Sequence, residues 1–207
     1  MNKEFERRDF LFEVRAEQDE SGNILTGRPI VYNSVTDLGC FNEMIETGAL
    51  NETDLTDVRF LVNHDTSRIP LARSRRNNGN STMFLQPDQD GLSIRVTLDT
   101  ENNPEAAALY SAVRRGDITG MSFGFRVNDE EWIDAMSEHP TRIIKSISKV
   151  IEVSACTFPA YDSSEIQARS KETLESVRSS LESARQQAEV DTSALEIARL
   201  RAKIKIL

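Results

Sequence analysis

Short runs of alternating apolar and polar residues recur along the first three quarters of the chain, and this pattern limits the possible folds most strongly. The clearest run places Leu92, Ile94, Val96 and Leu98 at every second position. Side chains of a β-strand point alternately to its two faces, so this spacing indicates a strand with one buried face. Many short strands favour a barrel or a sandwich. The other predicted strands are 9–16, 24–32, 58–63, 82–86, 119–127 and 142–158.

Two helices are predicted between these strands. One is a short helix near 42–49, and the other covers 104–115, where Pro104 suits a helix start and Gly116 follows the last turn. The polar stretch 128–141 contains Pro140 and is predicted to be a hairpin loop.

The composition changes after Pro159. Residues 164–207 contain no Gly or Pro, which predicts helix. Capping-box patterns at Ser164 and Ser193 predict two helices with a break near 190–193. The apolar stripe of this tail either packs on the strands or mediates association. We therefore expect a domain at 1–161 and a helical tail at 162–207. The heptad-like positions are Leu174, Val177, Leu181, Ala184 and Ala188, then Ile197, Leu200, Ile204 and Leu207.

Charge and cysteine usage exclude several classes of protein. The net charge of -9 argues against a nucleic-acid-binding protein, because phosphate contacts require clustered Lys and Arg. The charged N-terminus lacks the apolar core of a signal peptide, and no run approaches the ~18 apolar residues of a membrane span. These features predict a cytoplasmic protein. Cys40 and Cys156 fit no metal-ligand spacing, so we expect two small buried thiols and no metal or cofactor.

A histidine general base can only be His64 or His139, the two histidines of the chain. His64 follows the apolar run Phe60–Val62, where a strand end would hold its imidazole at the edge of a core. His139 lies in the polar loop. A single histidine at a strand end is more often structural, so a second motif is needed to favour catalysis.

That second motif is the segment 120–125, with the sequence GMSFGF. It places Ser122 between two glycines in an otherwise apolar strand, which leaves room for a substrate to approach the hydroxyl. It differs from the G-x-S-x-G elbow of hydrolases, because strand residues rather than a helix follow the serine. By itself it also fits a buried serine bonded to the backbone.

Together, Asn63-His64-Asp65, the segment 120–125, and Ile151–Ser154 running into Pro159-Ala160 resemble the procapsid (prohead) serine proteases of tailed phages. The resemblance covers about residues 9–161. It implies a mainly β, α+β protein: an assemblin-like β-barrel with flanking helices and a helical C-terminal tail. Phe123 departs from the pattern, since a smaller aliphatic residue is more common there in the family.

The resemblance implies that Ser122 is the nucleophile of a serine endopeptidase and His64 its general base. A third residue must orient the imidazole and stabilise its protonated form. Glu152 interrupts the apolar strand Val150–Val153, and an unpaired buried carboxylate would cost several kcal/mol. Pairing with His64 would explain this charge, whereas simple strand alternation would instead leave Glu152 facing solvent.

Other polar residues remain candidates near the site. His139 is an alternative third member because assemblins use a second histidine. Asp65 is another, although the neighbour of His64 on an extended strand would point to the opposite side. Arg73, Arg75 and Arg76 are either electrostatic helpers or, more simply, a solvated basic turn.

The expected substrates are the major capsid protein with its scaffolding segment and the protease itself, cleaved inside the immature capsid in the host cytoplasm. A homo-oligomer is expected by resemblance to assemblins, with the tail as an assembly or packaging element. The alternative is a noncatalytic capsid-assembly or scaffolding protein, which the presence of Ser122 and His64 argues against. A metal-dependent hydrolase would need about three clustered ligands, which His64 and Asp65 do not supply.

Overall fold

The strands of this protein form two sheets, as seen in a computed structural model that describes residues 5–10, 14–19, 22–76, 78–157 and 171–204. The larger sheet has the order β1-β10-β11-β5-β4, with β6 pairing with β11 and with β7. Its strands are β1 (Glu6–Phe10), β4 (Thr36–Asp37), β5 (Asn42–Ile45), β6 (Arg59–Val62), β7 (Ala72–Arg73), β10 (Gly120–Ile133) and β11 (Thr141–Cys156). The smaller sheet has the order β2-β3-β9-β8. Its strands are β2 (Val14–Asp19), β3 (Gly22–Val31), β8 (Met83–Asp88) and β9 (Gly91–Leu98).

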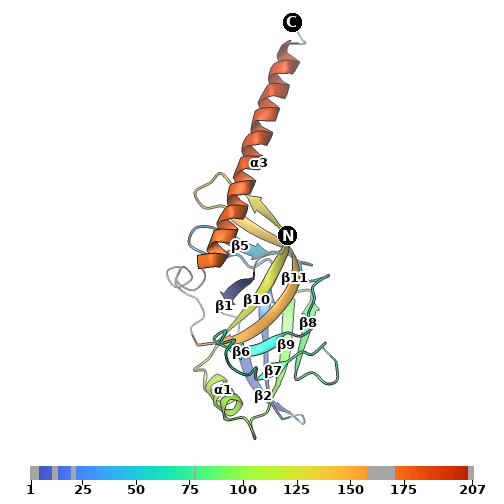
Figure 1. Cartoon of the computed structure of the whole chain (residues 1–207), viewed down its shortest axis with the longest axis vertical. Helices are drawn as coiled ribbons and strands as arrows, with labels where there is room; N and C mark the ends of the chain where they lie inside the picture. Colours follow the sequence, from blue (N-terminus) through green and yellow to red (C-terminus); the bar gives the residue numbers. More distant parts are fainter. Residues whose placement is uncertain (1–4, 11–13, 20–21, 77, 158–170, 205–207) are drawn as a thin grey trace.

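The long strand β11 organises the larger sheet. One edge pairs antiparallel with β10, and β1 pairs with the far edge of β10. The other edge pairs in parallel with two different strands, β5 at Thr141–Ile144 and β6 at Glu152–Ala155. β5 and β6 therefore lie at opposite ends of β11 (Figure 1).

The main core lies between the two sheets. The four alternating residues of β9, Leu92 to Leu98, are all buried, as their spacing predicts. The larger sheet contributes Phe60, Met121 and Phe123 to the same cluster. The predicted class, mainly β with flanking helices, is confirmed, although the strands form two sheets rather than one closed barrel.

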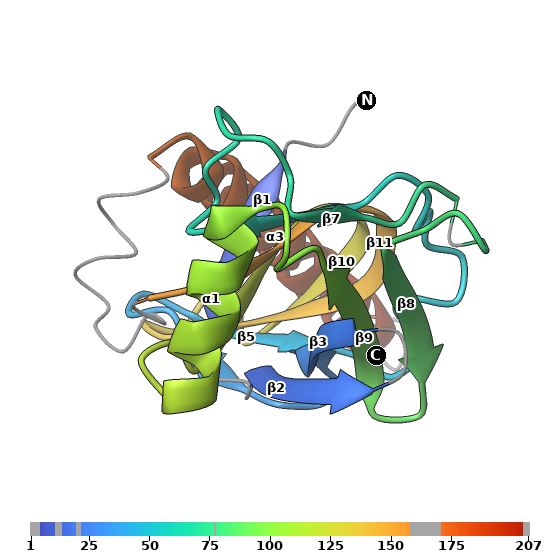
Figure 2. The ribbon, with the colours of Figure 1, turned by 90° about the horizontal axis from the view of Figure 1, so that it is seen from below.

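Helix α1 (Pro104–Arg115) has the predicted bounds. The side chain of Asn103 accepts hydrogen bonds from the backbone N–H groups of Glu105 and Ala106, which satisfies two free donors of the first turn. Gly116 has φ 79° and ends the helix in the left-handed conformation that glycine adopts without strain. The helix lies beside β2 and β3 of the smaller sheet (Figure 2).

Three local predictions were wrong. Residues 42–45 form β5 rather than a helix, because the alternating pattern buries Glu43 against Arg142 of the adjacent strand β11 and Arg8 of β1. The stretch 128–141 is a loop only at 134–140, since β10 and β11 extend their pairing to Ile133 and Thr141. Cys156 is buried as expected, but Cys40 is exposed.

Helix α3 (Lys171–Ile204) is continuous, so the predicted break near 190–193 is wrong. Polar side chains there bond within the helix: Gln187 Nε2 donates to Asp191 Oδ1 at 3.0 Å, and Thr192 Oγ1 donates to the Ala188 carbonyl at 2.8 Å. This segment contains no Gly or Pro, the two residues that most disfavour a helix interior, so the helix continues through it. The domain boundary near 161 and the first capping box lie outside the described residues.

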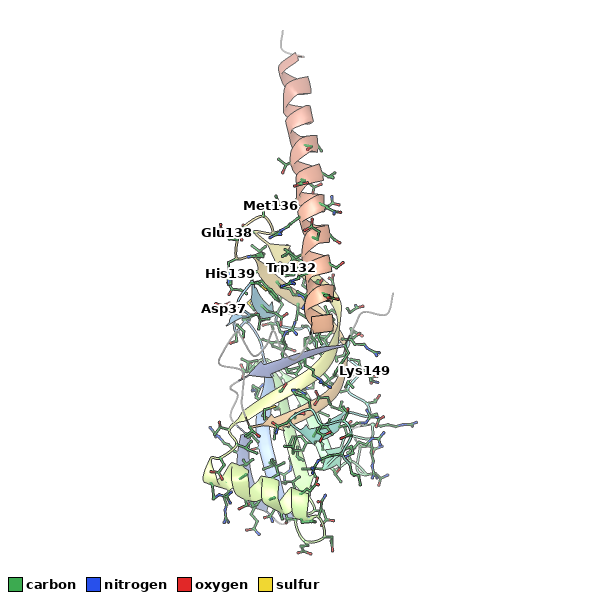
Figure 3. The ribbon with its side chains drawn as sticks, turned by 60° about the vertical axis from the view of Figure 1, so that its left-hand side comes forward. Asp37, Trp132, Met136, Glu138, His139 and Lys149 are labelled. Carbon is green, nitrogen blue, oxygen red and sulfur yellow. The ribbon has the colours of Figure 1, made fainter. Side chains whose placement is uncertain are left out.

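The first part of α3 packs on the protein, and its later part extends away (Figures 1 and 3). Val177 is buried against Leu38, Phe41 and Trp132. Further along the helix, Val190 is 62% exposed. The apolar stripe therefore packs on the strands where α3 begins and faces solvent at Val190.

Candidate active site

One face of the larger sheet brings the catalytic candidates together. Ser122 on β10 is the register partner of Ser154 on β11, and Glu152 lies two residues before Ser154. Register partners and alternate residues point to the same face of a sheet. β6 lies on the other side of β11 and ends directly before Asn63 and His64. Ser122 and His64 therefore flank β11 from its two neighbouring strands.

A left-handed turn directs the His64 side chain onto this face. Asn63 has φ 50° and His64 has φ 58°, a region that few residues other than glycine adopt. Hydrogen bonds hold the turn in place: Asn63 N donates to the Ala155 carbonyl at 3.0 Å, and the Asn63 amide bonds Thr157 through both its oxygen and its nitrogen. Local backbone strain is thus stored at the position that orients the imidazole.

Glu152 is the partner of the imidazole. Its Oε1 lies 2.6 Å from His64 Nδ1, and both side chains are nearly buried, at 2% and 9% exposure. Its second oxygen, Oε2, accepts a hydrogen bond of 2.6 Å from the Ser154 hydroxyl. The carboxylate of Glu152 therefore has a buried histidine partner. This pairing explains the charged residue in an otherwise apolar strand, as the sequence predicts.

Ser154 joins the acid to the histidine turn, and sequence reasoning gave it no role. Its hydroxyl donates to Glu152 and accepts a hydrogen bond of 3.2 Å from the backbone N–H of His64. Ser154 is completely buried. The available signal was the i, i+2 spacing of Glu152 and Ser154, which places both side chains on one face of a strand.

Gly124 leaves space for the acid. A Cβ atom at this position would lie 2.4 Å from the ring of Phe5 and 2.8 Å from Glu152 Oε1. Gly124 is also the register partner of Glu152. Gly124 is therefore needed because a larger residue would clash with Glu152 and Phe5. The sequence had instead suggested that the glycines leave room around Ser122.

Ser122 itself is completely buried, and its hydroxyl donates to the Arg8 carbonyl of β1 at 2.7 Å. This matches a strand serine bonded to the backbone. β1 is also the strand that carries Arg7, whose Nε lies 4.0 Å from Glu152 Oε1. Strand β1 thus contacts both the hydroxyl and the acid.

The structure places the two alternative third members elsewhere. His139 lies 3.3 Å from Asp37 at the β5 end of the sheet (Figure 3). Thirteen residues separate it from Glu152, which is roughly 40 Å along an extended chain. Asp65 is half-buried and accepts hydrogen bonds from the backbone and hydroxyl of Ser67. The backbone turns at His64, so the extended-strand argument against Asp65 does not apply.

Arg75 and Arg76 lie in a surface turn, and Arg73 ends strand β7 just before it. Arg73 forms an ion pair with Asp57, and Arg75 and Arg76 are exposed with positive φ angles. Among the described residues, no hydrogen bond or ion pair joins these arginines to Ser122, His64 or Glu152. The simpler expectation, a solvated basic turn, fits this arrangement.

A second buried polar group, the charge cluster, lies on the opposite face of β1. It consists of Glu6, Arg8, Glu43, Glu130 and Arg142. Arg142 Nη1 donates to Glu6 at 2.6 Å and to Glu43 at 2.9 Å, and Arg8 bonds the same two carboxylates. Burial alone would raise the pKa of Glu6, but Arg8 and Arg142 outweigh it and hold that pKa below its usual value.

The described residues show neither a metal site nor a membrane-spanning helix. No group of three or more His, Cys, Asp or Glu side chains in that part of the chain is arranged to hold a metal ion. Among the helices described, none combines the length and apolar character of a membrane span.

Comparison with known proteins gives the family. Residues 11–179 match the model of the caudovirus prohead serine proteases. The chain belongs to this family. It is 30% identical to the prohead protease of Enterobacteria phage HK97 over 171 residues. The alignment covers 80% of this chain and 69% of that protein. The solved capsid assembly protease of bacteriophage T4 aligns with 75% of this chain and 99% of its own, with 14% identity and a TM-score of 0.45.

As a prohead serine protease, this protein is a peptide-bond hydrolase of phage capsid maturation. The predicted function and enzyme class are therefore confirmed, and the noncatalytic alternative is not favoured. A serine protease requires a nucleophilic serine and a base to activate it. The candidates for these roles lie on one face of the larger sheet: Ser122, His64 and Glu152.

Proposed function

We propose that Ser122, His64 and Glu152 are the nucleophile, general base and orienting acid of this prohead protease. The observation that carries the proposal is the 2.6 Å contact between His64 Nδ1 and Glu152 Oε1. With Nδ1 facing the carboxylate, Nε2 is the ring nitrogen that takes part in proton transfer. This is the arrangement that a serine nucleophile needs.

In the reaction, His64 Nε2 takes the Ser122 proton while Oγ attacks the carbonyl carbon of the scissile peptide. The C–N bond then breaks, and the imidazolium gives its proton to the leaving amine. Water, activated by the same imidazole, hydrolyses the acyl-enzyme and restores Ser122. Glu152 stabilises the positive charge on His64 throughout.

The described geometry corresponds to a resting state. A hydroxyl has one proton, and that of Ser122 is donated to the Arg8 carbonyl. Because Ser122 is also buried, cleavage requires the hydroxyl to turn toward His64 and the face to open to a peptide. Unliganded active sites often tighten their catalytic hydrogen bonds only when substrate binds.

The proposed substrates are the scaffolding segment of the major capsid protein and the protease itself, within the immature capsid in the host cytoplasm, where the protease acts as a homo-oligomer. The relative from phage HK97 is named for the prohead, which supports this location. The later part of α3, where Val190 is exposed, is proposed as the assembly or packaging element.

Expression of wild type beside Ser122→Ala tests the catalytic assignment. Autolytic fragments should accumulate with wild type and be absent with Ser122→Ala. Ser148→Ala is the matched control, because Ser148 also donates from a strand to a neighbouring carbonyl, at 3.1 Å, but lies exposed on β11. Equal fragmentation of all three proteins would reject Ser122 as the nucleophile.

Truncation after Glu189 tests the role of α3. The shortened chain keeps Val177 and its packing partners but lacks the later part of the helix. It should retain peptide cleavage and fail to enter capsids, measured by the protease content of purified procapsids. Normal incorporation would reject the packaging role, and lost cleavage would place the helix in folding instead.

A further inference from the structure

An apolar groove opens beside the histidine turn, between the segment that follows β6 and the helix α1. Its volume is about 480 Å³, within the ~300–1,000 Å³ of typical ligand sites. Leu61 and Leu71 line one side, and Ala108, Leu109 and Ala112 of α1 line the other.

The walls of the groove continue the elements that carry the catalytic candidates. Leu61 is the register partner of Ser154, which in turn pairs with Ser122, so it belongs to the same face of the sheet. Asn63 and Asp65, the two neighbours of His64, also line the groove.

Ile118 also lines the groove and precedes Ser122 by four residues, or roughly 13 Å of extended chain. The groove is therefore bordered by residues close in the chain to both His64 and Ser122. A peptide that lies across Ser122 and His64 can place a nearby side chain in it.

The residues that line the groove indicate which kind of chemical group can bind in it. The side chains facing the cavity are mostly aliphatic, and the charges at its rim are paired with one another. Arg68 lies 2.5 Å from Glu105 and 3.3 Å from Asp65. Ile69, also at the groove, is 83% exposed, an unusual state for a large apolar side chain. Such a site favours an apolar group over a charged one.

We propose that this groove is a substrate subsite that holds one large apolar side chain of the cleaved polypeptide, within about four residues of the scissile bond. The inference rests on the proposed function, since it places the peptide across Ser122. Small side chains at 108 and 112 leave the volume that the substrate residue fills, and binding there positions the peptide for attack.

The test fills the groove from the surface of α1 with Ala108→Trp. Ala108 is exposed and contacts none of the catalytic candidates, so the helix should tolerate the change. Ala107→Trp is the matched control, because Ala107 lies on the same helix but faces a different cavity beside Asn23 and Thr100. Ala112→Leu is a second, milder way to fill the groove.

The probes are fluorescence-quenched peptides that span the autolysis junction, with each of four residues on either side replaced in turn by Leu, Phe or Ala. Wild type should prefer Leu or Phe to Ala at one position by about tenfold or more in kcat/KM. Ala108→Trp and Ala112→Leu should lose this preference. Ala107→Trp should keep it.

Two results would overturn the subsite: no apolar preference at any position in wild type, or full preference in both groove-filling variants. Either result leaves the catalytic assignment intact as long as the Ala peptide is cleaved. The catalytic assignment fails separately, if Ser122→Ala cleaves that peptide as fast as wild type.

Discussion

Two neighbouring arginines on β1 serve two different buried polar groups. Arg8 enters the charge cluster, where its guanidinium bonds Glu6 and Glu43. Arg7 points to the opposite face and approaches Glu152 only to 4.0 Å. In the charge cluster each carboxylate meets a guanidinium, whereas Glu152 meets an imidazole and a hydroxyl. A guanidinium keeps its proton, but an imidazole can exchange one near neutral pH.

The difference separates stability from chemistry within one sheet. The charge cluster joins β1, β5, β10 and β11 through arginine–carboxylate pairs, and Ser180 of α3 donates to its Glu130. The catalytic face keeps one acid beside a group whose charge can change. We therefore expect changes in the charge cluster to lower stability and changes on the catalytic face to lower rate.

The largest expected effect is that of Glu152→Gln on catalysis. The amide keeps the shape of the side chain but removes the charge that stabilises the imidazolium, so kcat should fall about 10⁴-fold. The midpoint of thermal unfolding should change little. Steady-state cleavage of the autolysis-junction peptide and a thermal melt measure the two quantities. His139→Ala should retain activity, and a loss equal to that of Glu152→Gln would contradict the assignment.

The reverse pattern is expected for Arg142→Met. Removal of this guanidinium leaves Glu6, Glu43 and Glu130 with too little positive charge, which should cost about 3–5 kcal/mol of unfolding free energy. Urea unfolding measures the loss. Any protein that remains folded should cleave peptide at a near-normal kcat. Unchanged stability would show that the cluster does not hold the sheet together.

A smaller effect on rate is expected for Ser154→Ala. The hydrogen bond to Glu152 is charge-assisted, and loss of such a bond costs about 1.5–3 kcal/mol, or roughly 10- to 100-fold in kcat. KM should stay the same, because Ser154 positions the catalytic groups and is buried away from bound peptide. Ser154→Thr, which keeps the hydroxyl, should restore part of the rate. An increase in KM alone would instead assign Ser154 to substrate binding.

The smallest expected effect is the acid sensitivity of the charge cluster. The folded-state pKa of Glu6 lies below its ordinary value of 4.5, so the carboxyl stabilises the fold above pH 4.5. This contribution disappears as pH falls from 4.5 through the lowered pKa. Fluorescence of Trp132, the single tryptophan, should follow the loss, since its indole donates to Ser180 of α3. Glu6→Gln should show a flatter acid dependence, and an identical curve would contradict the linkage.

Local patterns predicted much of this structure correctly. The alternation in β9 identified a half-buried strand, and Pro104 with Gly116 marked both ends of α1. Both signals depend only on residues close together in the chain, so they can be recognised without knowledge of the tertiary fold. The prediction for 42–49 failed because pairing of β5 with the distant strand β11 overrides local preference. The prediction for the end of β10 failed because its hairpin with β11 continues through polar residues to Ile133.

The candidate site was predictable as a set of residues but not as an arrangement. Glu152 was a candidate because it is a charged residue in an apolar strand. The base could only be one of the two histidines of the chain. No local signal showed that Asn63 and His64 form a left-handed turn, or that Ser154 bonds both the acid and the turn. Those features require β6 and β11 to lie side by side.

The sequence by itself determined which strands have a buried face and where α1 begins and ends, because these depend on residue type and spacing. The side chains proposed for the protease reaction were named from the sequence through its resemblance to the family. Only the tertiary structure decided that His64 meets Glu152 rather than His139 or Asp65, and that Ser122 bonds β1 in the resting state. Register between strands distant in sequence makes those choices, because parallel pairing of β6 with β11 leaves no local trace in the chain.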